Sequence, residues 1–149
     1  MHIILVRHGK PDLSSKAHCT PRDMKDWVAR YQKAPVPAGQ EPEETRRLAQ
    51  AAGYVVSSPS SRCIRSLEYL MGRTGSPVDD VYAEAHLPYL EVDTPRLPVK
   101  AWRLLFRSAW FLGFAAHTES IRRSSVRAAQ AADRLIDLAE RHGSVLLLG

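Results

Sequence analysis

Side chains suited to phosphoryl transfer follow the apolar runs that predict strands in this sequence. Arg7 and His8 come directly after the first run, Arg62 begins the helix after the second, and Glu84 follows the third. A neutral imidazole is a competent nucleophile, guanidinium groups match phosphate oxygens in bidentate fashion, and a carboxylic acid can protonate a leaving oxygen. Because open α/β sheets bind ligands at the carboxyl ends of their strands, we expect these side chains to meet at one edge of the sheet.

The elements that must position these residues alternate along the chain. Short apolar runs predict strands at residues 2–7, 54–57, 78–83 and 144–148. One-face spacing and capping residues predict helices at residues 20–34, 43–52, 62–71, 102–110 and 118–142, with Thr20 as the first N-cap and Gly53 closing the second helix. This alternation predicts an α/β fold, a three-layer sandwich with helices flanking both faces of a mainly parallel sheet.

Length and composition are those of an ordinary folded domain. The 149 residues fit one domain, spanning 1–149, and hydrophobic and charged fractions of 44% and 25% are typical of globular proteins. Two cysteines are too few for a disulfide scaffold, and the first strand begins without a signal sequence, so we expect a cytoplasmic protein. The longest apolar stretch, residues 102–114, is shorter than the roughly 20 residues that span a bilayer, so no membrane anchor is predicted.

The charge balance favours an anionic partner, since the net charge is +5. The basic residues are spread along the chain, with no zinc-finger spacing or lysine-rich block, which argues against a nucleic-acid reader. The six histidines lack acidic or cysteine partners at ligand spacing, so the sequence predicts no metal site and no cofactor. The charge is therefore compatible with a phosphorylated small molecule as the partner.

Three local patterns carry a resemblance to a known family. The segment LVRHG (residues 5–9) and the segment VSSPSSRC (residues 56–63) resemble the opening signature and the serine-serine-proline turn, with its downstream arginine, of the histidine phosphatase superfamily, the phosphoglycerate mutase-like group. The segment YAE (residues 82–84) is a weaker match to the place where many members keep a proton-donating glutamate. The order and spacing of these segments resemble the family over nearly the whole chain.

The resemblance implies a metal-independent phosphatase that works through a phosphohistidine and acts on a small phosphorylated metabolite or a phosphoprotein. His8 would carry the phosphoryl group, Arg7 and Arg62 would neutralise its oxygens, and Glu84 would donate a proton to the leaving group. Water would then release phosphate. A phosphoglycerate mutase-type transferase is the lower-ranked alternative, because nothing in the sequence indicates the lid with which a mutase must exclude water.

The end of the sequence departs from the family pattern. In the family the last strand leads into a second histidine that binds the phosphoryl group, whereas VLLLG (residues 145–149) ends before such a residue, and neither His86 nor His117 occupies that position. Loss of one preorganised electrostatic donor costs on the order of 100- to 1,000-fold in turnover. This keeps a second interpretation open, a phosphate-ligand binding or interaction module with impaired catalysis.

Four further residues are candidates for the substrate pocket: Lys10, Ser58, Arg103 and Arg107. The resemblance matches residues 86–117 to the part of the family that roofs the active site. Arg103 and Arg107 lie one helical turn apart in this insertion, so they are candidates to contact a substrate anion, with a solvated basic surface as the alternative.

Several side chains also have ordinary structural interpretations. Glu84 fits a solvated surface carboxylate about as well as a proton donor. Arg62 begins a helix, where the helix dipole disfavours a cation, so a bound anion explains it better. Cys63 lacks the arginine that a cysteine phosphatase needs in the same loop, so cysteine chemistry is not predicted. Their spacing on one helical face places Trp102, Phe106 and Trp110 in the core.

Overall fold

The computed structural model describes residues 1–14, 17–39 and 41–149, which form two compact units. Unit 1 is built from Met1–Asp12, Pro35–Glu84 and Arg127–Gly149. Unit 2 is built from Leu13–Ala34 and Ala85–Val126, and therefore includes the segment 86–117. The chain passes between the units four times, and each unit has a hydrophobic core of its own.

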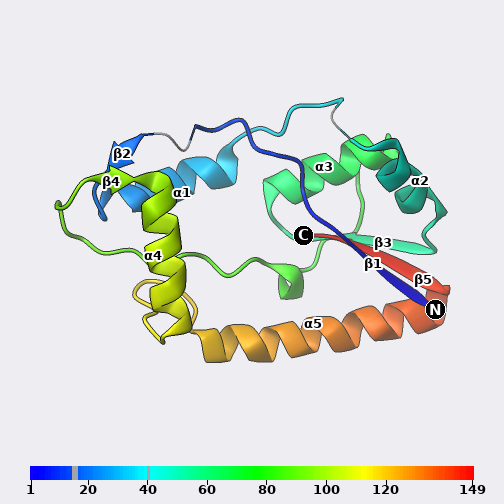
Figure 1. Ribbon diagram of the computed structural model, residues 1–149. Helices are drawn as coiled ribbons and strands as arrows, with labels where there is room; N and C mark the ends of the chain where they lie inside the picture. Colours follow the sequence, from blue (N-terminus) through cyan, green and yellow to red (C-terminus); the bar gives the residue numbers. More distant parts are fainter. Residues whose placement is uncertain (15–16, 40) are drawn as a thin grey trace. The chain divides into compact units, whose positions relative to one another are not determined.

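Unit 1 contains a parallel sheet of three strands. The order is β1 (His2–Val6), β5 (Ser144–Leu148) and β3 (Tyr54–Ser57), so the last strand in the sequence is the central one (Figure 1). Pairing on both sides buries Leu146 and Leu148 completely. Because all three strands run in the same direction, their carboxyl ends lie at one edge of the sheet.

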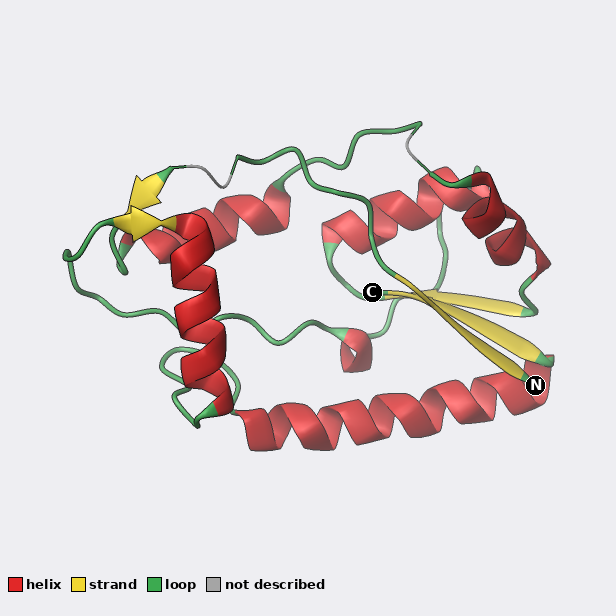
Figure 2. Ribbon diagram, viewed as in Figure 1, coloured by secondary structure: helices red, strands yellow, loops and turns green. Residues whose placement is uncertain are grey.

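Helices cover both faces of this sheet (Figure 2). The helices α2 (Glu43–Ala51) and α3 (Ser61–Met71) pack on one face, and α5 (Ile121–His142) packs on the other. The core under α2 and α3 contains Ala49, Val55, Cys63, Leu67, Leu70, Leu146 and Leu148, and the core under α5 contains Val56, Tyr82, Leu135, Ala139 and Val145. The predicted three-layer α/β sandwich with a mainly parallel sheet is confirmed.

The predicted strand at residues 78–83 is wrong. Within the described residues this segment joins the sheet through an isolated parallel bridge between Val78 and Ser57, and Asp80–Tyr82 forms the 3-10 helix η1. The reason is local: the Asp79 carboxylate accepts a hydrogen bond from the Val81 N–H at 3.0 Å. That side-chain cap favours a turn over continued extension.

The described part of unit 2 contains the helices α1 (Asp23–Lys33) and α4 (Val99–Phe111), the first residues of α5 and a short ribbon. The helices α1 and α4 share one apolar core, and β2 (His18–Cys19) pairs antiparallel with β4 (Leu97–Pro98). Sequence periodicity did not predict the ribbon, because two-residue strands have no measurable alternation.

Trp102 and Phe106 of α4 form part of this core. Trp102, Phe106 and Trp110 are all buried, which confirms their predicted place. The Trp102 indole N–H also donates to the Cys19 carbonyl at 2.8 Å and so fixes α4 to the ribbon.

The ends of two helices test the predicted caps. Thr20 is not the N-cap of α1, which begins at Asp23 after the helical residue Arg22. The Thr20 hydroxyl accepts from the Asp23 N–H at 3.2 Å while the Asp23 carboxylate accepts from the Thr20 N–H at 2.9 Å, so these contacts hold the turn that leads into the helix. Gly53 does not end α2, which stops at the extended residue Ala52. Glycine is needed at 53 for another reason, because a Cβ there would collide with the carbonyl oxygen of His142.

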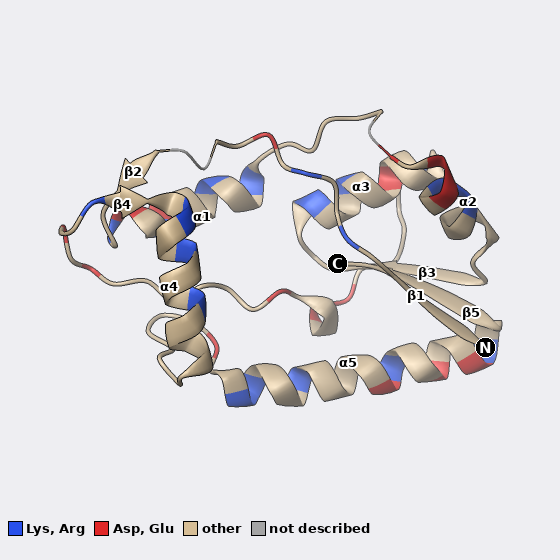
Figure 3. Ribbon diagram, in the orientation of Figure 1, with Lys and Arg blue, Asp and Glu red and all other residues tan. Residues whose placement is uncertain are grey.

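Positive charge is concentrated in unit 2, where α1 and α4 carry several Lys and Arg side chains (Figure 3). The segments of unit 2 contain eleven Lys and Arg against five Asp and Glu, whereas those of unit 1 contain ten against eleven. Among the helices of the described ranges, none is long and apolar enough to cross a membrane.

Candidate active site

His8 is held at the end of β1 by the backbone and by one ring contact. Its N–H donates to the Gly149 carbonyl at 2.9 Å, so the pairing of β1 with β5 continues to this residue. The imidazole is buried, and its Nδ1 lies 2.7 Å from the Gly9 carbonyl oxygen. Because a carbonyl oxygen can only accept, Nδ1 carries the proton and Nε2 keeps its lone pair. This is the tautomer that a nucleophilic imidazole needs.

Arg62 lies beside that lone pair, in the first turn of α3. Its side chain is 3% exposed. The guanidinium Nε donates to His8 Nε2 at 3.4 Å, and Nη2 donates to Glu84 Oε2 at 3.0 Å. A buried cation that joins an imidazole to a carboxylate is suited to hold phosphoryl oxygens between them.

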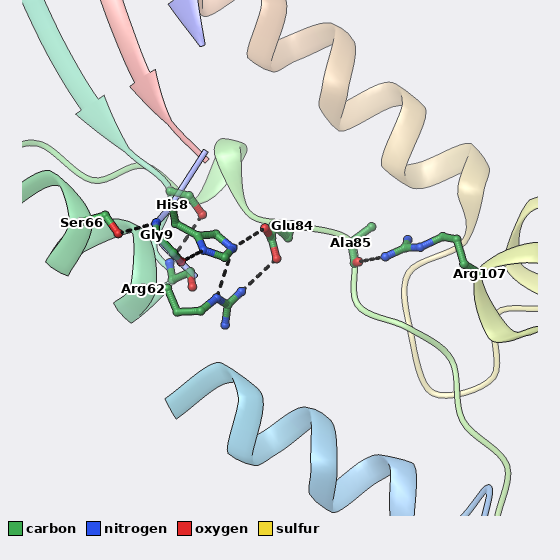
Figure 4. Close-up of polar contacts among 9 residues, drawn as sticks. His8, Gly9, Arg62, Ser66, Glu84, Ala85 and Arg107 are labelled. Atoms are coloured by element: carbon green, nitrogen blue, oxygen red, sulfur yellow. Dashed lines mark hydrogen bonds and ion pairs between the residues drawn. The ribbon is translucent and has the colours of Figure 1, made fainter. Parts of the chain in front are cut away.

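Glu84 completes the cluster from the segment that follows η1. Its Oε1 lies 3.7 Å from His8 Nε2, and its side chain is 45% exposed. The structure therefore brings together His8, Arg62 and Glu84, three of the four side chains expected at the strand ends (Figure 4). Glu84 is the most exposed of the three, which suits a group that exchanges protons with substrate or water.

Two residues that support the cluster were not singled out from the sequence. The Gly9 N–H donates to the Ser66 hydroxyl oxygen at 2.9 Å, so α3 holds the residue whose carbonyl orients His8 (Figure 4). A Cβ on Gly9 would lie 2.5 Å from Cγ1 of Val36, so this position requires glycine. The available signal was spacing, because Ser66 follows Arg62 by four residues and lies on the same face of α3.

Arg7 does not join the cluster. Its side chain is exposed, and in the described part of the chain no hydrogen bond or ion pair links it to His8, Arg62 or Glu84. It lines a cavity of about 380 Å³ beside β1, together with apolar residues such as Leu5 and Leu48.

Within the described residues, no hydrogen bond or ion pair joins Lys10 or Ser58 to His8, Arg62 or Glu84. Lys10 is exposed. Ser58 is fully buried, where its N–H donates to the Leu148 carbonyl and its hydroxyl accepts from the Ser60 N–H at 3.5 Å. Its polar groups thus build the turn that starts α3.

Arg103 and Arg107 both belong to unit 2. Arg103 lies over the rings of Trp27 and Tyr31, at 5.8 and 5.9 Å from their centroids. Arg107 donates to the Ala85 carbonyl at 3.4 Å (Figure 4).

The two histidines considered as substitutes for a second site histidine also lie in unit 2. His86 is paired through Nδ1 with the Gln32 amide at 2.9 Å. His117 is stacked on Tyr89.

Cys63 is a poor alternative nucleophile, as the sequence predicted. Its side chain is fully buried, and burial raises the pKa of the thiol, with the Ser58 hydrogen bond acting in the opposite direction. A raised pKa disfavours the thiolate that cysteine chemistry requires. Among the described residues no group of three or more His, Cys, Asp or Glu side chains is placed to hold a metal ion.

No protein-family model and no curated protein matches this chain in sequence. Its fold does have counterparts among solved structures. An Escherichia coli K-12 protein assigned as an alpha-ribazole-5′-P phosphatase is similar at a TM-score of 0.59 and 13% identity, over 99% of this chain and 72% of that one. Bacillus stearothermophilus YhfR is similar at a TM-score of 0.56 and 18% identity, over 99% of this chain and 73% of that one. A mycobacterial glucosyl-3-phosphoglycerate phosphatase complexed with VO3 is similar at a TM-score of 0.54 and 21% identity, over 99% of this chain and 74% of that one.

Proposed function

Because the chain has the phosphoglycerate mutase-like fold of the histidine phosphatases, we propose that it hydrolyses phosphate monoesters through a covalent intermediate on His8. The observation that carries the proposal is the orientation of the imidazole. Its Nδ1–H is bound to the Gly9 carbonyl, and Nε2 faces Arg62 and Glu84. A nucleophile, a phosphate-binding cation and a proton donor are therefore within one cluster.

The proposed reaction has two steps. First, Nε2 of His8 attacks phosphorus, the bond from phosphorus to the ester oxygen breaks, and the leaving oxygen takes the proton of the Glu84 carboxyl group. Water then attacks the phosphohistidine, its proton passes to the Glu84 carboxylate, and the nitrogen–phosphorus bond breaks to release phosphate and neutral His8. Arg62 binds the phosphoryl oxygens in both steps, which supplies positive charge without a metal ion.

The proposed substrate is a small phosphorylated metabolite, with a phosphoprotein as the second class. Two structural neighbours bear the names of phosphatases for alpha-ribazole-5′-P and glucosyl-3-phosphoglycerate, which supports the first class. We propose that water accepts the phosphoryl group. A mutase, in which a second hydroxyl accepts the group, is the lower-ranked proposal.

The test is hydrolysis of 4-nitrophenyl phosphate, with EDTA present, by the wild type, His8→Ala and His2→Ala. His8→Ala should lower kcat by about 1,000-fold or more, because it removes the nucleophile. His2 is exposed at the opposite end of β1, so His2→Ala should retain wild-type turnover. Rapid quenching should trap an acid-labile phosphoprotein that His8→Ala does not form. Turnover that persists in His8→Ala, or that EDTA abolishes, would refute the proposal.

One observation favours a second candidate function, phosphate-ligand binding without turnover. Arg62 is the one guanidinium that the structure joins to His8 within the described residues, while Arg7 lies apart from the cluster. A site with one cation can bind phosphate yet stabilise the transition state poorly. This candidate predicts saturable binding of inorganic phosphate that Arg62→Ala weakens, with no phosphoenzyme.

A further inference from the structure

Glu84 is held by very little regular structure. It follows η1 and begins a stretch, residues 83–96, that contains neither helix nor strand. Its side chain is tied to Arg62, but that ion pair must loosen when Arg62 binds a phosphoryl group. A proton donor that is misplaced by about 1 Å costs on the order of 100-fold in rate, so some other group has to fix this backbone.

Arg127 of α5 is placed to do so. Its guanidinium Nη1 donates to the Val81 carbonyl at 3.2 Å and also to the carbonyl of Ala83, the residue directly before Glu84. These contacts lie within unit 1, and the side chain that makes them is partly buried. One cation on a long helix thus holds the two carbonyls that lead into the candidate proton donor.

We infer that Arg127 is a positioning residue for Glu84, which it aims by holding the carbonyls of Val81 and Ala83. This inference rests on the proposed phosphatase function. Arg127 acts through the backbone: it fixes the main chain from which the Glu84 carboxyl group delivers its proton to the leaving oxygen while His8 takes up the phosphoryl group. The arrangement makes α5 part of the active site although its sequence has no catalytic motif.

The test uses the dependence of the rate on the leaving group. A poor leaving group such as an alkoxide needs a proton from Glu84 as its bond to phosphorus breaks, whereas 2,4-dinitrophenolate leaves without one. Arg127→Gln should therefore lower kcat/KM for an alkyl phosphate by about 100-fold and for 2,4-dinitrophenyl phosphate by no more than about threefold. Arg127→Lys, which keeps a donor and a charge, should recover part of the alkyl phosphatase activity.

Two comparisons separate positioning from a general loss of structure. Arg141→Gln changes the same charge on the same helix, where Arg141 pairs with Asp137, and should leave both rates unchanged. Adding Arg127→Gln to Glu84→Gln should slow the alkyl phosphate reaction no further, because the group being positioned is already gone. Equal losses with both leaving groups, or additive losses in the double variant, would overturn the inference.

A structural measurement keeps this inference distinct from the proposed function. Hydrogen exchange in a peptide covering residues 80–88 should be at least about tenfold faster in Arg127→Gln, while exchange in β3 and β5 stays as in the wild type. Unchanged exchange in residues 80–88 refutes the inference whether or not the chain is a phosphatase. If residues 80–88 exchange faster in Arg127→Gln but the wild type hydrolyses neither ester, the proposed function is refuted, while the contact of Arg127 with this backbone is upheld.

Discussion

At His8, a single backbone hydrogen bond determines which ring nitrogen keeps a lone pair. The Nδ1–H donates to the Gly9 carbonyl, and Nε2 accepts from Arg62 Nε. In the absence of a phosphoryl group, Arg62 is also the partner of Glu84. A bound phosphoryl group would compete with Glu84 for this guanidinium.

Arg62 should therefore tolerate no cationic substitute. Arg62→Lys keeps the charge but loses the planar fork that contacts His8 and Glu84 together, and we expect kcat/KM for an aryl phosphate to fall about 100-fold. Arg65→Lys is the matched control, since Arg65 is exposed on the same helix and pairs with Glu68. Wild-type activity in Arg62→Lys would show that a point charge suffices and that the fork has no role.

At the scale of elements, Gly9 is the point where the strand end and the segment around Val36 approach most closely. Gly9→Ala should cost about 1–3 kcal/mol in the free energy of unfolding, because the new methyl group would meet the β-branched side chain of Val36. The measurement is urea unfolding of a double-mutant cycle. In a Val36→Ala background the cost of Gly9→Ala should shrink. The same cost in both backgrounds would show that strain elsewhere, and not this contact, is responsible.

The contact between Thr20 and Asp23 at the start of α1 predicts that the stability of the fold depends on pH. The backbone N–H of Thr20, followed by its hydroxyl, lowers the pKa of Asp23 below its ordinary value of 3.8. A carboxyl group with a depressed folded pKa stabilises the fold above its unfolded pKa, and this stabilisation is lost as pH falls through the folded pKa.

The urea midpoint of the wild type should therefore exceed that of Asp23→Asn at pH 7, and the difference should narrow as the pH falls below about 4. Tryptophan fluorescence reports this transition, because Trp27 and Trp102 lie in the core that α1 shares with α4. Asp26→Asn, at an exposed site in the same helical turn, is the control. A difference that widens toward low pH would contradict the sign of the shift.

For the whole molecule, the path of the chain couples the two units. Unit 1 consists of three segments that the two segments of unit 2 connect, and α5 runs without a break through the boundary at residues 126 and 127. Unfolding of unit 2 would turn its segments into flexible loops. The entropy cost of closing these loops would then lower the stability of unit 1.

We therefore predict one cooperative transition, as expected for a single domain over residues 1–149. Pulsed hydrogen exchange along a urea series should give the same midpoint for β5 in unit 1 and for α4 in unit 2. Two separate midpoints would show that the units unfold independently.

The sequence by itself determined most of the elements and the grouping of three side chains. Local signals were sufficient for β1, β3 and β5 and for the helices, since apolar periodicity and capping chemistry act over a few residues. The proximity of His8, Arg62 and Glu84 was expected because parallel strands bring their carboxyl ends to one edge, whereas the choice of Glu84 as proton donor came from the family resemblance. Glu84 lies near His8 although the segment before it is a 3-10 helix and not the expected strand.

The tertiary structure alone decided the strand order, the tautomer of His8 and the group that holds Glu84. These depend on contacts between residues far apart in the sequence, such as Gly9 with Ser66 and Arg127 with Ala83. Backbone carbonyls have no identity in a sequence, so their partners cannot be recognised from residue types or spacing. For the same reason Arg7, adjacent to His8 in the chain, was expected in the cluster, whereas in the folded chain it is exposed and lines the cavity beside β1.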